Sequence, residues 1–288
     1  MMQNTNQDPR LSGVLASLDA TTEAEHKYFK QRSVIIPSRK EIILIIKRIQ
    51  SLMFPAYFAV DADANLSRDE RIAALFETVK RQVSAAYAFS TQPSPVDTES
   101  VAYTILEKLP EIKETLLRDV EALYEGDPAA RSPEEVILSY PGFYAISIYR
   151  IAHEFYKLGV PYVARIMTEF AHEKTGVDIH AGATIGEYFF IDHGTGIVIG
   201  ETTTIGDHVK IYQGVTLGAK SFELDEEGNP IKGTKRHPDI GNRCVIYANA
   251  TILGGNTRIG DGTVVGANVW LTHSVGPDPT VYYSEKCK

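Results

Sequence analysis

The sequence contains little cysteine and no long apolar stretch. Only two of its 288 residues are cysteines, Cys244 and Cys287, which excludes a disulfide-built secreted fold and a zinc site made of four thiolates. The longest aliphatic run, 42–46, ends at Lys47 and Arg48 and is far too short to span a bilayer. The polar start of the chain lacks the apolar core of a signal peptide. We therefore expect a soluble, cytoplasmic protein that does not contact a membrane.

An excess of positive charge is also missing. The chain has 29 lysines and arginines against 37 aspartates and glutamates, a formal net charge of −8. Proteins that bind nucleic acid through its phosphates need a basic surface, so we expect no nucleic-acid partner. With 43% apolar residues, the chain can form one large domain or two of ordinary size.

Glycine usage divides the chain near residue 177, because 18 of the 22 glycines follow position 175. Before that point, apolar residues recur with the period of an α-helix, which predicts a helical domain over 1–176. Gly176 stands where a helix end favours a left-handed residue. For 1–32 the sequence is too polar and irregular to predict whether the segment is ordered. Helices are expected at about 42–49, 68–90, 98–109, 111–124, 143–158 and 162–174.

After residue 177 the aliphatic residues recur every six positions, a period that fits neither a helix nor an alternating strand. Hexapeptide repeats fold as a parallel β-helix, in which three hexads make one triangular coil. We expect a left-handed β-helix over 177–275 and a tail over 276–288; a glycine-rich β-sandwich with coincidental spacing is the weaker alternative. The inward residues would be Ile179, Ile185, Ile191, Ile199, Ile205, Ile211, Leu217, Ile240, Ile246, Ile252, Ile259, Val265 and Leu271.

The six-residue period is broken at three places. The step from Ile191 to Ile199 has eight residues and contains Asp192-His193-Gly194-Thr195-Gly196, and a later step has seven. A step of twenty-three residues predicts a loop, 218–238, that leaves the stack and ends in Lys235-Arg236-His237-Pro238. Long loops in a compact domain are usually functional.

Several motifs resemble the hexapeptide-repeat acyltransferases and, within them, the serine O-acetyltransferase family. They are Gly126-Asp-Pro-Ala129, Gly176-Val-Asp-Ile-His180, Ile191-Asp-His-Gly-Thr-Gly-Ile197, Gly200-Glu201, Gln213-Gly-Val-Thr-Leu-Gly218 and Arg236-His-Pro238. The resemblance implies transfer of the acetyl group of acetyl-CoA to the hydroxyl of L-serine, which gives O-acetylserine and CoA as the first step of cysteine biosynthesis. It implies no metal.

Acetylation of an alcohol needs a general base, because the hydroxyl must lose its proton as it attacks the thioester. A histidine beside a carboxylate supplies such a base and stabilises the imidazolium that forms. His193 follows Asp178 by 15 residues, close to one coil of about 18 residues, so the two can be stacked neighbours. The resemblance implies that this pair is the catalytic dyad. The alternative for His193 is a corner histidine bonded to a backbone carbonyl.

The resemblance also implies how the amino-acid substrate is held. Asp127 and Asp192 would bind the ammonium group, Arg236 the carboxylate, and His237 the region of the hydroxyl. Arginine suits a carboxylate because its planar fork can bind two oxygens at once. The alternatives are that Asp127 is an ordinary turn residue and that Arg236-His237 is an exposed loop end.

Acetyl-CoA is expected along the outside of the coils, between neighbouring subunits of a homotrimer or a dimer of trimers. By resemblance, its pantetheine arm would lie near the small residues Gly218, Ala219, Ala248 and Ala267. Tight coil corners also require small residues, which is the alternative reading of these positions. Many relatives end in an isoleucine that docks into cysteine synthase; this chain ends in Lys288, so we do not expect that complex.

Three other functions remain as alternatives. A hexapeptide acetyl- or succinyltransferase for a sugar or another amino-acid-like acceptor is the enzymatic one, and a β-helix scaffold without activity is the binding one. A γ-class carbonic anhydrase would need three zinc-binding histidines, and no two of the histidines in the repeat region are five residues apart.

Overall fold

The computed structural model describes residues 8–20, 35–90, 97–222 and 224–282. The chain falls into two compact units, residues 1–36 and 37–288. The first contains helix α1 (Pro9–Ala20), all of whose residues are exposed. Of 1–32, for which the sequence makes no prediction of order, only 8–20 is described. Cys287 and Lys288 lie outside the described residues.

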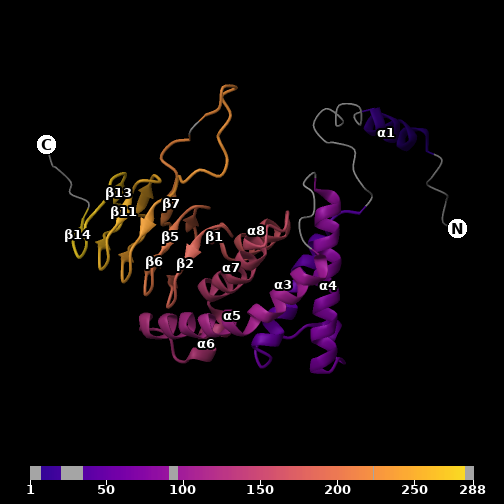
Figure 1. Cartoon of the computed structure of the whole chain (residues 1–288), viewed down its shortest axis with the longest axis horizontal. Helices are drawn as coiled ribbons and strands as arrows, with labels where there is room; N and C mark the ends of the chain where they lie inside the picture. Colours follow the sequence, from indigo (N-terminus) through magenta and orange to yellow (C-terminus); the bar gives the residue numbers. More distant parts are fainter. Residues whose placement is uncertain (1–7, 21–34, 91–96, 223, 283–288) are drawn as a thin grey trace. The chain divides into compact units, whose positions relative to one another are not determined.

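The second unit begins with helices and continues as a β-helix (Figure 1). Ser67 and Glu70 form a capping box at the start of one helix. Gly176 ends another helix with a left-handed φ of 71°, as the sequence predicts. The helices are α3 (Arg39–Met53), the 3-10 helix η2 (Asp61–Asp63), α4 (Arg68–Phe89), α5 (Thr98–Gly126), α6 (Pro133–Ser139), α7 (Pro141–Lys157) and α8 (Val163–Thr175).

The two helices predicted at 98–109 and 111–124 are one helix, α5, which runs through Pro110. A proline inside a helix removes one backbone hydrogen bond and favours a break. The apolar face nevertheless continues on both sides of Pro110, where Ile105, Ile112 and Leu116 are buried. Packing of that face keeps the helix in one piece.

The β-helix consists of short parallel strands in three sheets. The first sheet has the order β1-β4-β7-β10-β13, the second β11-β8-β5-β2, and the third β14-β12-β9-β6-β3. The strands are β1 (Asp178–Ile179), β2 (Thr184–Ile185), β3 (Phe190–Asp192), β4 (Val198–Ile199), β5 (Thr204–Ile205), β6 (Lys210–Tyr212), β7 (Thr216–Gly218), β8 (Asp239–Ile240), β9 (Val245–Ile246), β10 (Thr251–Leu253), β11 (Arg258–Ile259), β12 (Val264–Val265), β13 (Trp270–Leu271) and β14 (Thr280–Val281).

The aliphatic residues predicted to point inward form the core of the β-helix. Every one of them is buried, with at most 8% of its surface exposed. Residues of neighbouring coils stack directly, as Ile191 does on Ile211 and Ile211 on Ile246. The six-residue period therefore predicts both the fold and its core correctly.

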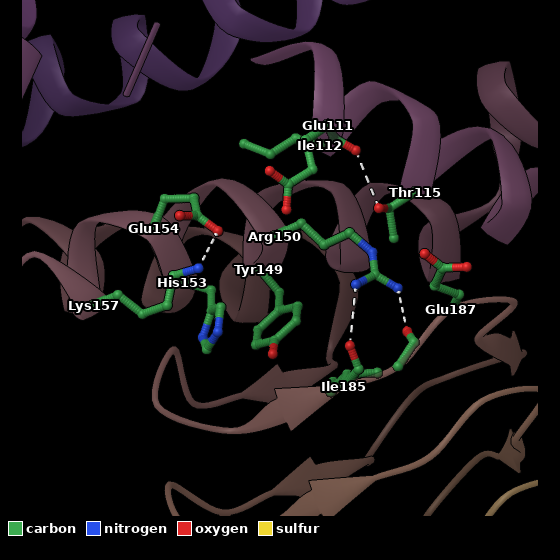
Figure 2. A pocket seen from close by; sticks show the side chains of 11 residues that line it. Glu111, Ile112, Thr115, Tyr149, Arg150, His153, Glu154, Lys157, Ile185 and Glu187 are labelled. Atoms are coloured by element: carbon green, nitrogen blue, oxygen red, sulfur yellow. Dashed lines mark hydrogen bonds and ion pairs between the residues drawn. The ribbon is translucent and has the colours of Figure 1, made fainter. Parts of the chain in front are cut away.

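A buried ion pair fastens α5 and α7 to the first coil. Arg150 donates from Nε and Nη2 to the two carboxylate oxygens of Asp119, at 2.6 and 2.9 Å, and Asp119 also accepts the backbone N–H of Phe189 at 2.9 Å. Arg150 also donates to the carbonyls of Ile185 and Gly186, at 3.3 and 2.8 Å (Figure 2). Burial raises the pKa of Asp119, and the Arg150 charge opposes that rise. This ion pair thus connects α5, α7 and the first coil, which contains β1, β2 and β3, and we call it the polar anchor.

A pocket of about 230 Å³ opens beside this anchor (Figure 2). Charged side chains in its wall are already paired: Lys157 contacts Glu154 at 2.7 Å, and Glu187 contacts Arg118 at 2.6 Å. Residues of α5, α7 and the first coil line the pocket, so it lies where the helices meet the β-helix.

Candidate functional site

The first group of predicted site residues lies at the corner between β3 and β4. Asp192 ends β3, and His193 and Gly194 follow with left-handed φ values of 56° and 88°. This turn accommodates the two extra residues of the eight-residue step. Nδ1 of His193 is 3.7 Å from Oδ1 of Asp192, and 70% of the His193 side chain is exposed. The imidazole is therefore accessible to a substrate.

Asp127 reaches the same corner from the end of α5. The ring of Phe190 lies so close to Gly126 that a Cβ there would be 2.5 Å from it, so the helix end rests directly on β3. Tyr140 donates its hydroxyl to Asp127 at 2.5 Å, and the N–H of Ala129 donates at 2.8 Å. These bonds, Tyr140 first, lower the pKa of Asp127. The carboxylate therefore stays charged.

Electrostatics links Asp127 to the other members of the corner. Interaction with the His193 imidazole also lowers the pKa of Asp127. Burial, the hydrogen bond to Asp127 and the nearby Asp192 raise the pKa of Tyr140 to about 12. The structure thus brings Asp127, Asp192 and His193 together as an acidic corner with an exposed imidazole, which suits a substrate ammonium beside a reacting hydroxyl.

The second group of predicted site residues, Arg236 and His237, lies at the corner between the first and second sheets. There the chain leaves β4 for β5 and enters β8. Arg236 donates from Nη2 to Oε2 of Glu201 at 2.5 Å and from Nη1 to the carbonyl of Thr234 at 3.3 Å. The hydroxyl of Tyr156 donates to the other oxygen of Glu201 at 3.0 Å. Arg236 is thus held at this corner by a carboxylate, with about a fifth of its side chain exposed (22%).

His237 is buried at this second corner. Its Nδ1 accepts the N–H of Thr202 at 3.1 Å, and Oγ1 of Thr202 lies 2.9 Å from the same nitrogen. Gly200 gives the ring its space, because a Cβ there would be only 2.0 Å from Cδ2 of His237. Burial and, next, the Arg236 charge lower the pKa of His237 to about 4. The imidazole is therefore neutral near pH 7.

Asp178, the predicted partner of His193, lies on β1. It precedes the inward Ile179 and therefore faces outward on the first sheet, between the two corners. Among the described residues no hydrogen bond or ion pair joins Asp178 to His193; the carboxylate in contact with the imidazole is that of Asp192. The dyad stays a prediction.

The four residues predicted to bind acetyl-CoA form two pairs. The register Ile211–Ile246–Val265 places the residues two positions later in one column, which contains Gln213, Ala248 and Ala267, and His193 lies at the same corner one coil earlier. The N–H of Asn268 donates to the Ala248 carbonyl at 2.9 Å and joins two coils at this corner. Gly218 ends β7 and Ala219 follows it, at the opposite edge of the first sheet. Each corner therefore contains some of the residues predicted to bind the amino-acid substrate and some of those predicted to bind acetyl-CoA.

The two corners are separate within one chain. In the described part of the molecule, no hydrogen bond or ion pair connects the group of Asp127, Asp192 and His193 with Arg236 or His237. The residues expected to bind the ammonium group and those expected to bind the carboxylate of one substrate molecule thus lie at different edges of the first sheet.

Sequence reasoning missed Tyr140, Tyr156 and Thr202. Both tyrosines belong to the helical region, whose periodicity identifies buried faces but not the coil residue that a side chain touches. Thr202 follows the Gly200-Glu201 motif directly, and only its contacts with His237 reveal its role.

The chain is similar to known proteins in its sequence. Residues 59–147 match the family described as serine acetyltransferase, N-terminal. A plasmid-borne serine acetyltransferase of Synechococcus elongatus is 43% identical over 284 residues, which cover 92% of this chain and 88% of the relative. A serine acetyltransferase of Bacillus subtilis is 45% identical over 58% of this chain and 72% of its own length.

Solved structures show the same likeness. Serine acetyltransferase 1 of Entamoeba histolytica, in complex with L-cysteine, superposes with a TM-score of 0.71 at 40% identity, covering 83% of this chain and 86% of that one. A serine acetyltransferase of Neisseria gonorrhoeae, in complex with serine, gives a TM-score of 0.57 at 29% identity, with coverages of 84% and 95%. In the part of the chain that the structure describes, no helix is long and apolar enough to cross a bilayer.

Proposed function

Because this chain belongs to the serine acetyltransferase family, we propose that its two corners form one active site in which acetyl-CoA acetylates the hydroxyl of L-serine. The product is O-acetylserine, an intermediate of cysteine biosynthesis. The observation that carries the proposal is the division of charge: Asp127 and Asp192 are at one corner with His193, and Arg236 is at the other. This division matches a zwitterion whose ammonium and carboxylate lie apart.

The chemistry follows from these side chains. Asp127 and Asp192 bind the ammonium group, and Arg236 and the buried His237 form the end that receives the carboxylate and the hydroxyl region. His193 takes the proton of the serine hydroxyl as the oxygen attacks the thioester carbonyl. The carbon–sulfur bond then breaks, and the imidazolium returns the proton to the departing CoA thiolate. Asp178 and Asp192 are the carboxylates that stabilise the imidazolium.

A second copy of the chain completes the site. One corner of a triangular prism can face the opposite corner of a neighbouring prism, which would bring His193, Ala248 and Ala267 of one subunit opposite Gly218 and Ala219 of the next. Acetyl-CoA would occupy the groove between them, and the small residues at both edges leave it room. Three prisms related by a threefold axis would give three equal sites, so we propose a homotrimer or a dimer of trimers. The cytoplasmic location stays a prediction.

The test is release of free thiol from acetyl-CoA by the purified protein. We expect serine-dependent release, and only background release with a galactoside or without acceptor. Release with the galactoside alone would instead favour a sugar acetyltransferase, and no release with any acceptor would favour a scaffold. Light scattering of the same sample tests the assembly, since a monomer that acetylates serine would contradict the shared site.

A further inference from the structure

Tyr156, near the end of α7, joins the helical region to the arginine of the second corner. Its hydroxyl donates to Oε1 of Glu201 at 3.0 Å, and Oε2 of Glu201 accepts from Nη2 of Arg236 at 2.5 Å. Burial acts to raise the pKa of Glu201, but the hydrogen bonds from Arg236 and Tyr156 outweigh it and leave the pKa below its usual value. A charged carboxylate is therefore fixed from both sides.

The neighbouring residues are adapted to this contact. A Cβ on Gly182 would be 2.8 Å from Cζ and 2.9 Å from Oη of Tyr156, and 2.9 Å from Cγ of Glu201. The lack of a side chain at Gly182 thus opens the passage through which the phenol reaches Glu201. The ring of His180 packs edge-on against Tyr156, with centroids 5.8 Å apart, and Nδ1 of His180 accepts the Gly182 N–H at 3.0 Å.

The same contact forms one wall of a cavity of about 550 Å³. Tyr156, His180 and Glu201 line it, together with Tyr162 and Arg165. Tyr162 presents a second phenol to this cavity but has no part in the hydrogen bonds that lead to Arg236. The cavity therefore contains one tyrosine that is connected to the arginine and one that can serve as a matched control.

We propose that Tyr156 is a positioning residue: through Glu201 it fixes the guanidinium of Arg236 in the orientation that receives the substrate's carboxylate. This inference rests on the proposed function. Without the phenol hydroxyl, one oxygen of Glu201 loses its partner and the carboxylate can rotate. Arg236 would then turn with it, because the other bond of its guanidinium, to the Thr234 carbonyl, is long at 3.3 Å.

The first experiment compares Tyr156→Phe with Tyr162→Phe in the full-length protein. Tyr156→Phe should raise the KM for serine by about 10-fold, near the lower end of what one hydrogen bond to a charged group contributes. Because the carboxylate is held equally in the ground and transition states, kcat and the KM for acetyl-CoA should stay within about twofold. Tyr162→Phe should leave all three constants unchanged. An unchanged serine KM in Tyr156→Phe would overturn the proposal.

A second acceptor separates positioning from general support of the fold. Serinamide has the same ammonium and hydroxyl groups as serine but no carboxylate, so Tyr156→Phe should leave its kcat/KM unchanged. An equal loss with serine and serinamide would show that Tyr156 only supports the structure. In a Glu201→Ala background, which itself raises the serine KM, adding Tyr156→Phe should cost nothing further. Additive losses would refute the route through Glu201.

The outcomes also distinguish this inference from the function on which it rests. If the wild-type protein releases no thiol with serine, the proposed function fails, and the inference fails with it. If the wild-type protein is active and Tyr156→Phe behaves like Tyr162→Phe, only the inference fails.

Discussion

Gly200→Ala tests the second corner with a single methyl group. The added Cβ would lie 2.0 Å from Cδ2 and 2.2 Å from Nε2 of His237. Ordinary contact begins at 3.4 Å, so the ring must retreat by about 1.4 Å (3.4 − 2.0). Gly200 has no left-handed φ, and alanine fits its backbone. The whole effect therefore falls on His237, which Thr202 holds in place.

A shift of this size in a substrate-binding group should lower kcat/KM for serine by about 10²-fold. Overpacking of a buried ring should also cost about 1–3 kcal/mol of stability, seen as a lower thermal midpoint. Thiol release and thermal unfolding measure the two effects. Gly276→Ala is the matched control, since Gly276 also lies in the β-helix without a left-handed φ and a Cβ there meets nothing within 4 Å. It should change neither quantity.

The refuting result is a Gly200→Ala protein with a lower thermal midpoint but ordinary serine kinetics. It would show that the His237 ring serves the coil and not the substrate. A His237→Ala background isolates the clash, because the atoms that the new methyl group meets are then gone. There, Gly200→Ala should cost almost no further stability; the same loss as in the wild type would place the strain elsewhere.

Three further predictions concern the base, the co-substrate groove and pH. His193→Ala should lower turnover by about 10²–10⁴-fold with an unchanged thermal midpoint, and near-normal thiol release would exclude His193 as the general base. Ala248→Trp should raise the KM for acetyl-CoA but not that for serine, and a stability loss of several kcal/mol would instead identify Ala248 as a packing position. His237 is neutral in the folded chain, with a pKa of about 4 against 6.5 when unperturbed. Because the unfolded chain alone binds this proton between those values, stability should fall by up to about 3 kcal/mol as the pH drops from 6.5 to 4. Denaturant titrations across this range should show a weaker pH dependence in His237→Asn, and an equal dependence would contradict the assignment.

The β-helix could be predicted because the six-residue period of its aliphatic residues recurs in nearly every coil. A large aliphatic residue every six positions determines which side of the coil faces the core, so the sequence alone predicts that Ile211 and Ile246 point inward. The helical region is less determined, because its apolar face does not say whether a helix survives a proline. From Pro110 the sequence predicts two helices. The structure has one, because Ile105 and Ile112 on either side of the proline are both buried.

The candidate site divides in the same way. His193, Asp192, Arg236 and His237 belong to the repeats and their interruptions, so the motifs predict them and the coil geometry positions them. Tyr156 comes from a helix that meets the coil only in three dimensions, and no sequence spacing relates it to Glu201.

The stacking of the coils also implies an order of opening. Among the strands that the structure describes, each coil pairs only with the coil before it and the coil after it, and the first coil is also covered by α5, α7 and α8. Among the described strands β13 and β14 are the last rungs of their sheets, with a partner on one side only. In such a linear stack, unfolding proceeds inward from the end with a single neighbour. Amide protons in β13 and β14 should exchange with deuterium first and those of the first coil last, so the acidic corner, in the first coil, lies in the part of the stack that opens least often.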